Sequence, residues 1–176
     1  MNQHLEKVDG LAPFMRNPVL RLIELAKQKI GATLLIVHGF RSVSTQMQLY
    51  QQGRVYDRAQ NIWVAEDDAK IVTNARPGAS PHNIVDRLGT PSALAVDLIP
   101  LDALGQPDWT PGEKFWDDLY ELSWKVGLDP LGDPIGAYLA ADCGHFEEPA
   151  FRLKIEGLNL FLPSPDVQQG LLYREE

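Results

Sequence analysis

The sequence predicts an α+β domain in which helices pack against a small, mostly antiparallel sheet. Three observations support this fold class. Apolar residues recur at helical spacing in two long segments, short apolar runs rich in branched residues lie between them, and strands and helices do not alternate regularly. The 176 residues are enough for one domain with a substantial core.

The first predicted helix covers about residues 18–30. Asn17 is its expected N-cap, and Pro18 suits the first helical position. Gly31 is placed to end the helix. Its apolar face recurs every three or four residues and consists of Val19, Leu22, Ile23, Ala26 and Ile30.

Two short apolar runs predict buried strands. The first is residues 33–37 (TLLIV), and the second is residues 94–99 (LAVDLI), in which Asp97 is the only polar residue. A second helix is expected after the first strand, where either Ser42 or Ser44 can cap its N-terminus.

The last predicted helix begins with a capping box formed by Thr110 and Glu113, with Pro111 at the first helical position. Gly127 is expected to end it. A short strand is expected within residues 140–147. The inner face of the helix is predicted to consist of Phe115, Trp116, Leu119, Leu122, Ser123 and Val126.

The composition disfavours several classes of function. The net charge is −8 and the basic residues are scattered, whereas nucleic-acid binding depends on clustered lysine and arginine. No apolar run reaches membrane-spanning length. Cys143 is the only cysteine, which excludes an intrachain disulfide and zinc sites built from several cysteines. The first residues contain no apolar core of signal-peptide length, so we expect synthesis and folding in the cytoplasm.

Three short motifs contain the residues that indicate chemistry. They are residues 80–82 (SPH), 94–97 (LAVD) and 142–145 (DCGH). Each motif is a weak signal alone, because a single histidine beside a loop is usually a surface or hydrogen-bonded residue. Asp97 is less common, since a carboxylate buried in an apolar strand needs a cation, a metal or several hydrogen-bond donors.

Together, His82, Asp97 and His145 have the composition of a catalytic zinc site. Such sites use three ligands of the His, Asp or Glu type and leave one position for water. Zinc lowers the pKa of that water, and a base must then take its proton and return it to the leaving amine. Asp142, three residues before His145, is the candidate base.

These motifs resemble those of the M15 metallopeptidases. This family includes D-alanyl-D-alanine carboxypeptidases and dipeptidases and the L-alanyl-D-glutamate endopeptidases of phage endolysins. Its pattern is Ser-x-His, then Gly-x-Ala-x-Asp, then an acidic residue, two spacers and His. Residues 39–54 and 72–78 also resemble family segments. The resemblance covers about residues 17–149 and implies a Hedgehog/D-Ala-D-Ala peptidase-like fold.

The resemblance also implies a role for each site residue. Asp142 would be the general base. Arg41 would hold a substrate carboxylate or stabilise the oxyanion, because a fixed guanidinium suits both tasks. Ser80 would support the substrate site by hydrogen bonding. The cofactor would be Zn²⁺, with three ligands: His82, Asp97 and His145.

The sequence departs from the family pattern between the first two ligands. The family aspartate lies seven residues after the first histidine, whereas Asp97 lies fifteen residues after His82, which implies an insertion at about residues 84–92. Ala93 also replaces a family glycine. Asp86 is therefore an alternative ligand, although Asp97 is preferred because it lies in a strand-like segment.

Several neighbouring residues have two interpretations. Cys143 is interpreted as a spacer, with a thiol ligand or nucleophile as the alternative. His38 is interpreted as structural, although it can face the cleft. Glu147 is either exposed or a partner of a ligand histidine. Three tryptophans are interpreted as core residues rather than a sugar platform: Trp109, Trp116 and Trp124.

The predicted function is zinc-dependent hydrolysis of peptidoglycan stem peptides by one peptidase domain, residues 1–176, with its core at 17–149 and a C-terminal extension at 150–176. The missing leader favours an endolysin-type L-alanyl-D-glutamate endopeptidase. The alternatives are a D,D-carboxypeptidase or dipeptidase of the same fold, and a non-catalytic zinc-binding wall or phage structural module. We expect a monomer that acts on the wall, in the periplasm or outside the cell, after release.

Overall fold

The structure is a computed structural model that describes residues 7–130, 143–149, 155 and 157–163. Besides helical residues 7–9, its helices are α2 (Pro13–Lys29), α3 (Val43–Gln51) and α4 (Glu113–Lys125), with 3₁₀ turns η1 (Asp68–Lys70) and η2 (Pro81–Asn83). Its strands are β1 (Leu34–His38), β2 (Arg54–Asp57), β3 (Ile62–Ala65), β4 (Val85–Asp86), β5 (Ala95–Pro100), β6 (Asp129–Pro130), β7 (His145–Glu147) and β8 (Leu160–Phe161).

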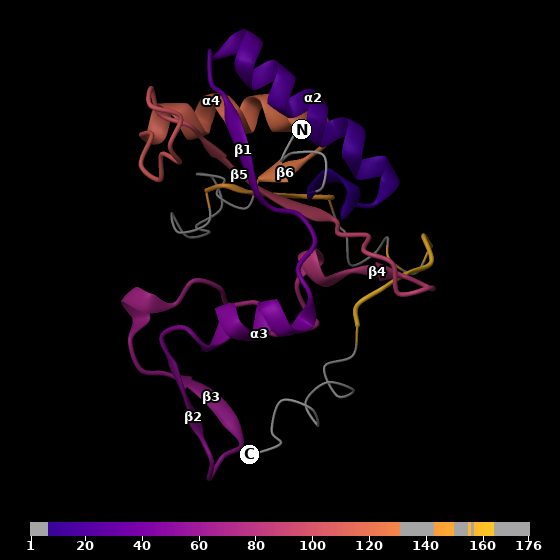
Figure 1. Cartoon of the computed structure of the whole chain (residues 1–176), viewed down its shortest axis with the longest axis vertical. Coiled ribbons are helices and arrows are strands. Elements are labelled where there is room, and N and C mark those ends of the chain that lie inside the picture. Colours follow the sequence, from indigo (N-terminus) through magenta and orange to yellow (C-terminus); the bar gives the residue numbers. More distant parts are fainter. Residues whose placement is uncertain (1–6, 131–142, 150–154, 156, 164–176) are drawn as a thin grey trace.

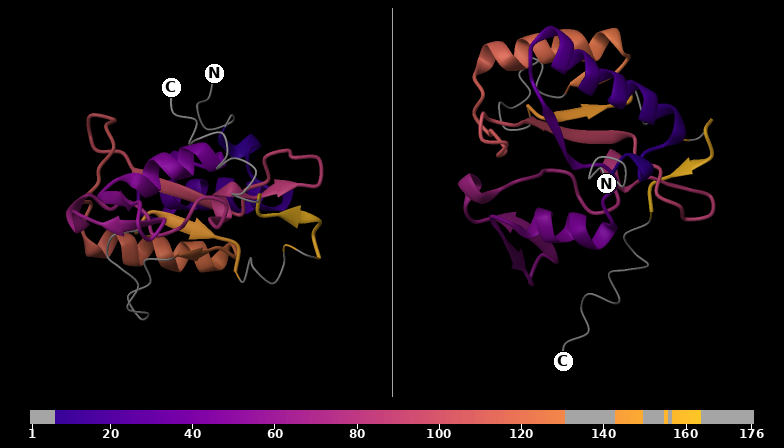
Figure 2. Two further views of the ribbon diagram at one scale, coloured as in Figure 1. Left: turned by 90° about the horizontal axis from the view of Figure 1, so that it is seen from below. Right: turned by 45° about the horizontal axis from the view of Figure 1, so that its top comes forward.

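The central sheet has the strand order β1-β5-β7-β6, and every pair in it is antiparallel. Helix α2 contacts β1 and α4, and α4 contacts β6, so these helices and the sheet enclose the main core. Helix α3 and the β2–β3 hairpin lie to one side of this unit, below it in Figure 1 and in the right-hand view of Figure 2. The predicted α+β class with a mostly antiparallel sheet is confirmed. None of the described helices is long and apolar enough to cross a membrane.

Helix α2 begins five residues earlier than the sequence predicted. Pro13 occupies one of the first two helical positions. Asn17 is therefore not the N-cap, and Pro18 lies inside the helix. The reason is burial of Met15, which extends the predicted apolar face by one turn and is 0% exposed. Burying a methionine is worth about 1.5–3 kcal/mol, which offsets half or more of the cost of a proline inside a helix, about 3 kcal/mol.

Helix α4 begins later than predicted, and its predicted capping box does not form. Gly112 is the N-cap with a φ of +95°, and no side chain caps the helix, so Thr110 and Pro111 precede it. Glycine adopts this positive φ readily, and the chain therefore turns into the helix at this point. The predicted inner face is present, because its members are buried or packed against the core.

The predicted strands and the second helix agree with the structure to within a residue or two. Residues 33–37 and 94–99 correspond to β1 and β5. Ser42, rather than Ser44, caps α3: its Oγ accepts a hydrogen bond from the Thr45 N–H at 3.1 Å. Gly31 and Gly127 follow α2 and α4 with positive φ, as expected for residues that end helices.

The insertion expected at about residues 84–92 forms β4 and a turn. The Asp86 carboxylate accepts hydrogen bonds from the backbone N–H groups of Leu88 and Thr90, both at 2.8 Å, which stabilises this turn. Strand β4 pairs with β8 of the C-terminal extension, where Leu160 is buried. Part of the extension therefore packs on the insertion.

Gly144 lies where the chain before β7 passes close to β5. The Leu98 N–H donates to the Gly144 carbonyl at 2.8 Å, and a Cβ on Gly144 would lie 2.6 Å from the Leu98 carbonyl oxygen. Because that oxygen belongs to the sheet backbone, it cannot move aside easily. We predict that Gly144→Ala lowers the free energy of unfolding by about 1–3 kcal/mol, measured by urea denaturation. A loss below about 0.5 kcal/mol, the range of a neutral surface substitution, would contradict this account of the glycine.

Candidate metal centre

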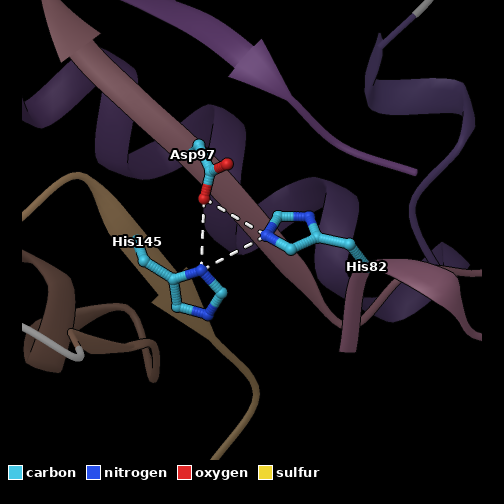
Figure 3. A group of neighbouring side chains, drawn as sticks. All are labelled: His82, Asp97 and His145. Atoms are coloured by element: carbon cyan, nitrogen blue, oxygen red, sulfur yellow. Dashed lines mark hydrogen bonds and ion pairs between the residues drawn. The ribbon is translucent and has the colours of Figure 1, made fainter. Parts of the chain in front are cut away.

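Three backbone segments bring His82, Asp97 and His145 to one point (Figure 3). Asp97 on β5 and His145 on β7 are paired directly across the two antiparallel strands, so their side chains share one face of the sheet. His82 lies on η2, which is joined to the start of β5 by the hydrogen bond from Leu94 N–H to the Pro81 carbonyl at 3.0 Å. Sheet register and one short turn therefore position the three side chains.

The ligand atoms of these residues form a nearly equilateral triangle. Asp97 Oδ1 lies 3.1 Å from His145 Nδ1 and 3.2 Å from His82 Nε2. The two ring nitrogens are 3.2 Å apart. Tetrahedral zinc with bonds of about 2.1 Å would separate its ligand atoms by about 3.4 Å. The triangle therefore fits zinc, and among the described residues it is the one group of three such side chains that could hold a metal.

The two histidines present opposite ring nitrogens to the triangle. His82 Nδ1 lies 2.7 Å from the Gly39 carbonyl oxygen, which can only accept, so Nδ1 carries the proton and Nε2 has the free lone pair. His145 Nε2 lies 3.1 Å from Glu147 Oε2, and its Nδ1 faces the triangle. The outer nitrogens of the two rings thus have different partners, a backbone carbonyl for His82 and a carboxylate for His145.

Burial and charge favour the protonation states that bind metals. Burial lowers the pKa of His82 below its ordinary value of 6.5, which keeps the imidazole neutral. Burial alone would raise the pKa of Asp97, but the contacts of its carboxylate with the imidazoles of His82, His145 and His38 outweigh it and hold that pKa well below 3.8. A neutral imidazole and an ionised carboxylate are the forms that coordinate zinc.

Arg41 lies directly beside the triangle. Its Nη2 forms an ion pair with Asp97 Oδ2, the carboxylate oxygen that is not part of the triangle with His82 and His145, and its Nη1 donates to Gln46 Oε1 at 3.3 Å. The side chain is only 10% exposed. The Arg41 backbone N–H also donates to the His82 carbonyl at 2.9 Å. Contacts within the site therefore hold both the side chain and the backbone of Arg41 in place.

His38 also belongs to the site, which the sequence left as the less favoured of two interpretations. An irregularity in the β1–β5 pairing between Ile36 and His38 places His38 opposite Asp97. Its Nδ1 lies 3.2 Å from Asp97 Oδ2, and the 39% exposed side chain lines the cleft. The signal in the sequence was a histidine at a strand end, three residues before Arg41.

Each of the four remaining predicted residues has a different outcome. Ser80 is buried, and its Oγ accepts from the His82 N–H at 3.3 Å, a contact at the start of η2. Asp86 stabilises the exposed turn of the insertion and does not join the triangle, so the structure separates it from Asp97. Asp142 lies outside the described residues. Cys143 lines the cleft without joining the metal group.

The triangle lies in a cleft of about 500 Å³. The interpretation of all three tryptophans as core residues is wrong for Trp109 and Trp124, which are 69% and 45% exposed. Trp109 precedes α4, so no helix face buries it, and it lines the cleft with Trp116. The lining of the cleft also includes Leu49, Val72, Thr73, Asn74 and Ala75.

Comparison with known proteins identifies the family. The sequence model of VanY, described as D-alanyl-D-alanine carboxypeptidase, matches residues 11–106, more than half of the chain. The chain belongs to the VanY family. The match includes His82 and Asp97 and ends before His145. No curated protein matches the chain.

Solved structures of VanY-like peptidases share the fold. A vancomycin resistance D,D-pentapeptidase VanY from a VanB-type resistance cassette, in complex with Zn(II), has a TM-score of 0.51 at 20% identity, covering 84% of this chain and 78% of that one. VanYB in complex with D-alanine-D-alanine has a TM-score of 0.52 at 19% identity, covering 94% and 84%. The LD-carboxypeptidase LdcB has a TM-score of 0.50 at 26% identity, covering 85% and 73%.

Membership of the VanY family confirms the predicted resemblance to M15 peptidases and the predicted enzyme class, a zinc metallopeptidase that acts on peptidoglycan peptides. The described residues contain a group that fits the expected Zn²⁺ cofactor. The single-domain organisation, the monomeric state, the site of action and the role of each site residue stay predictions.

Proposed function

We propose that this VanY family member cleaves peptidoglycan stem peptides with a zinc ion bound by His82, Asp97 and His145. The observation that carries this proposal is the triangle of ligand atoms, 3.1–3.2 Å apart, in an open cleft. When bound, zinc supplies Lewis acidity, which makes water more acidic and the scissile carbonyl more electrophilic. Proton transfer and the stabilisation of negative charge are assigned to side chains of the protein itself.

Asp142 is proposed as the general base. It precedes His145 by three residues, the spacing at which the M15 motif has its acidic residue. A carboxylate there takes the proton of the attacking water and returns it to the leaving amine. Of the described carboxylates near the metal position, Asp97 would be used as a ligand and Glu147 as the partner of His145, which leaves the base to another residue.

Arg41 is proposed to stabilise negative charge on the substrate. A guanidinium has five N–H donors, so Arg41 can keep its contact with Asp97 and still donate to a substrate carboxylate or to the oxyanion. Its position in the cleft lining supports this role. The contact with Asp97 gives it a second role, because it holds the outer oxygen of a metal ligand while the other oxygen faces the histidines.

The bond proposed for cleavage is the internal L-alanyl-D-glutamate bond. A carboxypeptidase must bind the terminal carboxylate of its substrate, for which charged donors are best suited. Among the described residues that line the cleft, Arg41 is the only lysine or arginine, so no second described cation in the lining supplements it in binding a terminal carboxylate. An endopeptidase has no such requirement. The family match favours the second candidate, removal of terminal D-alanine by D,D-carboxypeptidase activity.

Digestion of purified muropeptides distinguishes the two activities. We expect the zinc-loaded protein to release peptides with a new D-glutamate N-terminus and to leave L-alanine on the sugar, as identified by mass spectrometry and N-terminal labelling. Release of free D-alanine without such peptides would overturn the endopeptidase assignment and establish the carboxypeptidase. If the zinc-loaded protein produced neither product, both activities would be excluded for these substrates.

A further inference from the structure

We infer that Glu147 is a positioning residue that fixes His145 in the orientation and tautomer needed to bind the metal through Nδ1. This inference rests on the proposed zinc site. The Glu147 carboxylate lies 3.1 Å from His145 Nε2, on the side of the ring away from the triangle. None of the roles assigned above to the ligands, the base or the arginine uses this side chain.

The backbone of β7 places Glu147 beside its partner. Side chains two residues apart along a strand share one face, so His145 and Glu147 lie together while Phe146 points to the other face. Phe146 is 0% exposed and packs edge-on against the Tyr120 ring, with centroids 6.1 Å apart. Cross-strand pairs with Asp97 and Ala95 fix the register of β7. The contact between Glu147 and His145 is therefore set by the core and the sheet.

The hydrogen bond determines the proton position on the His145 ring. An ionised carboxylate can only accept, so Glu147 requires the proton on Nε2. The lone pair is then on Nδ1, which faces Asp97 Oδ1 at 3.1 Å and His82 Nε2 at 3.2 Å. The opposite tautomer would direct an N–H toward the metal position and leave two acceptors facing each other at Nε2.

The two ligand histidines differ in how their outer nitrogens are held. His82 relies on the backbone carbonyl of Gly39, which no side-chain substitution removes. His145 relies on a carboxylate that is 16% exposed and carries a charge. A carboxylate partner also increases the basicity of the ligating imidazole. Glu147 is thus a side chain through which the affinity of His145 for zinc can be changed without altering a ligand.

Zinc affinity is the measurement that tests this inference. Dissociation constants are obtained by competition with a chromogenic chelator for the full chain and for Glu147→Ala and Glu147→Leu, which both remove the acceptor. We expect binding weaker by about 10–100-fold in both variants. Glu147→Gln keeps an acceptor oxygen at the same reach but loses the charge, and we expect a smaller loss. Glu121→Ala is the matched control, because Glu121 is 71% exposed on α4 and outside the cleft.

A spectroscopic measurement separates positioning from general stability. In the Co²⁺-substituted protein, we expect the visible absorption bands to change in Glu147→Ala and Glu147→Leu and to recover toward the original spectrum in Glu147→Gln. If the original protein binds no zinc, the proposed function fails. If it binds zinc and both acceptor-free variants retain its affinity and its Co²⁺ spectrum, the role of Glu147 is overturned while the proposed function stands.

Discussion

His82→Ala is expected to lose stoichiometric zinc and to reduce peptidoglycan hydrolysis by at least about 10³-fold, because metal catalysis contributes several kcal/mol to the transition state. The His82 side chain is 1% exposed, and its Nε2 forms one corner of the triangle. Alanine leaves two ligand side chains and places no other nitrogen at that corner. Metal content by mass spectrometry and the rate of muropeptide cleavage check the prediction together.

Asp86→Ala is the matched control for this experiment, because it removes the carboxylate that the sequence left as an alternative ligand. Asp86 is the half-buried last residue of β4, and its carboxylate accepts from Leu88 and Thr90 in the turn that follows. We expect this variant to keep its zinc and its activity. Loss of zinc from Asp86→Ala, with zinc retained in Asp97→Ala, would transfer the ligand role to Asp86.

Asp142→Asn is expected to retain zinc and to lower kcat by about 10²–10⁴-fold, the usual contribution of general acid–base catalysis. Asparagine has nearly the same size as aspartate but cannot take a proton from water. Because Asp142 lies outside the described residues, its assignment rests on its place in the motif that ends at His145. Steady-state kinetics on a defined muropeptide, with metal content measured on the same sample, checks the prediction.

Asp118→Asn makes the same chemical change on the exposed side of α4, where Asp118 pairs only with Lys114 at 2.9 Å among the described contacts that involve its side chain. Its kcat should equal that of the unaltered protein. If Asp142→Asn kept the original kcat, Asp142 would not be the base. If it lost its zinc, Asp142 would be a metal ligand instead.

Local sequence patterns predicted the strands more reliably than the ends of the helices. The apolar runs that become β1 and β5 are buried by any arrangement of the core, and their composition is sufficient to identify them. The start of α2 depends on Met15, and the start of α4 depends on the turn at Gly112. Both depend on how the chain packs, which capping residues alone do not determine.

The candidate ligands were also predictable as residue types. His82 and His145 lie in compact local motifs, and a lone carboxylate in an apolar strand identifies Asp97 as a residue that needs a cationic partner. The choice between Asp97 and Asp86 was different, because the insertion changes the spacing on which the motif depends. The structure separates them: one is paired with His145 across the sheet, and the other folds a turn.

The sequence by itself determined the fold class, the kinds of ligand and their order along the chain, because these depend on composition and on short-range spacing. Only the tertiary structure decided which atoms meet. The β5–β7 register places Asp97 against His145, the irregularity in β1 brings His38 to the same carboxylate, and Glu147 selects the ring nitrogen of His145. The contacts of Asp97 with His145 and with His38 join residues dozens of positions apart. The contact between Glu147 and His145 is local and depends on the strand conformation of β7. All three contacts therefore arise from strand pairing and core packing.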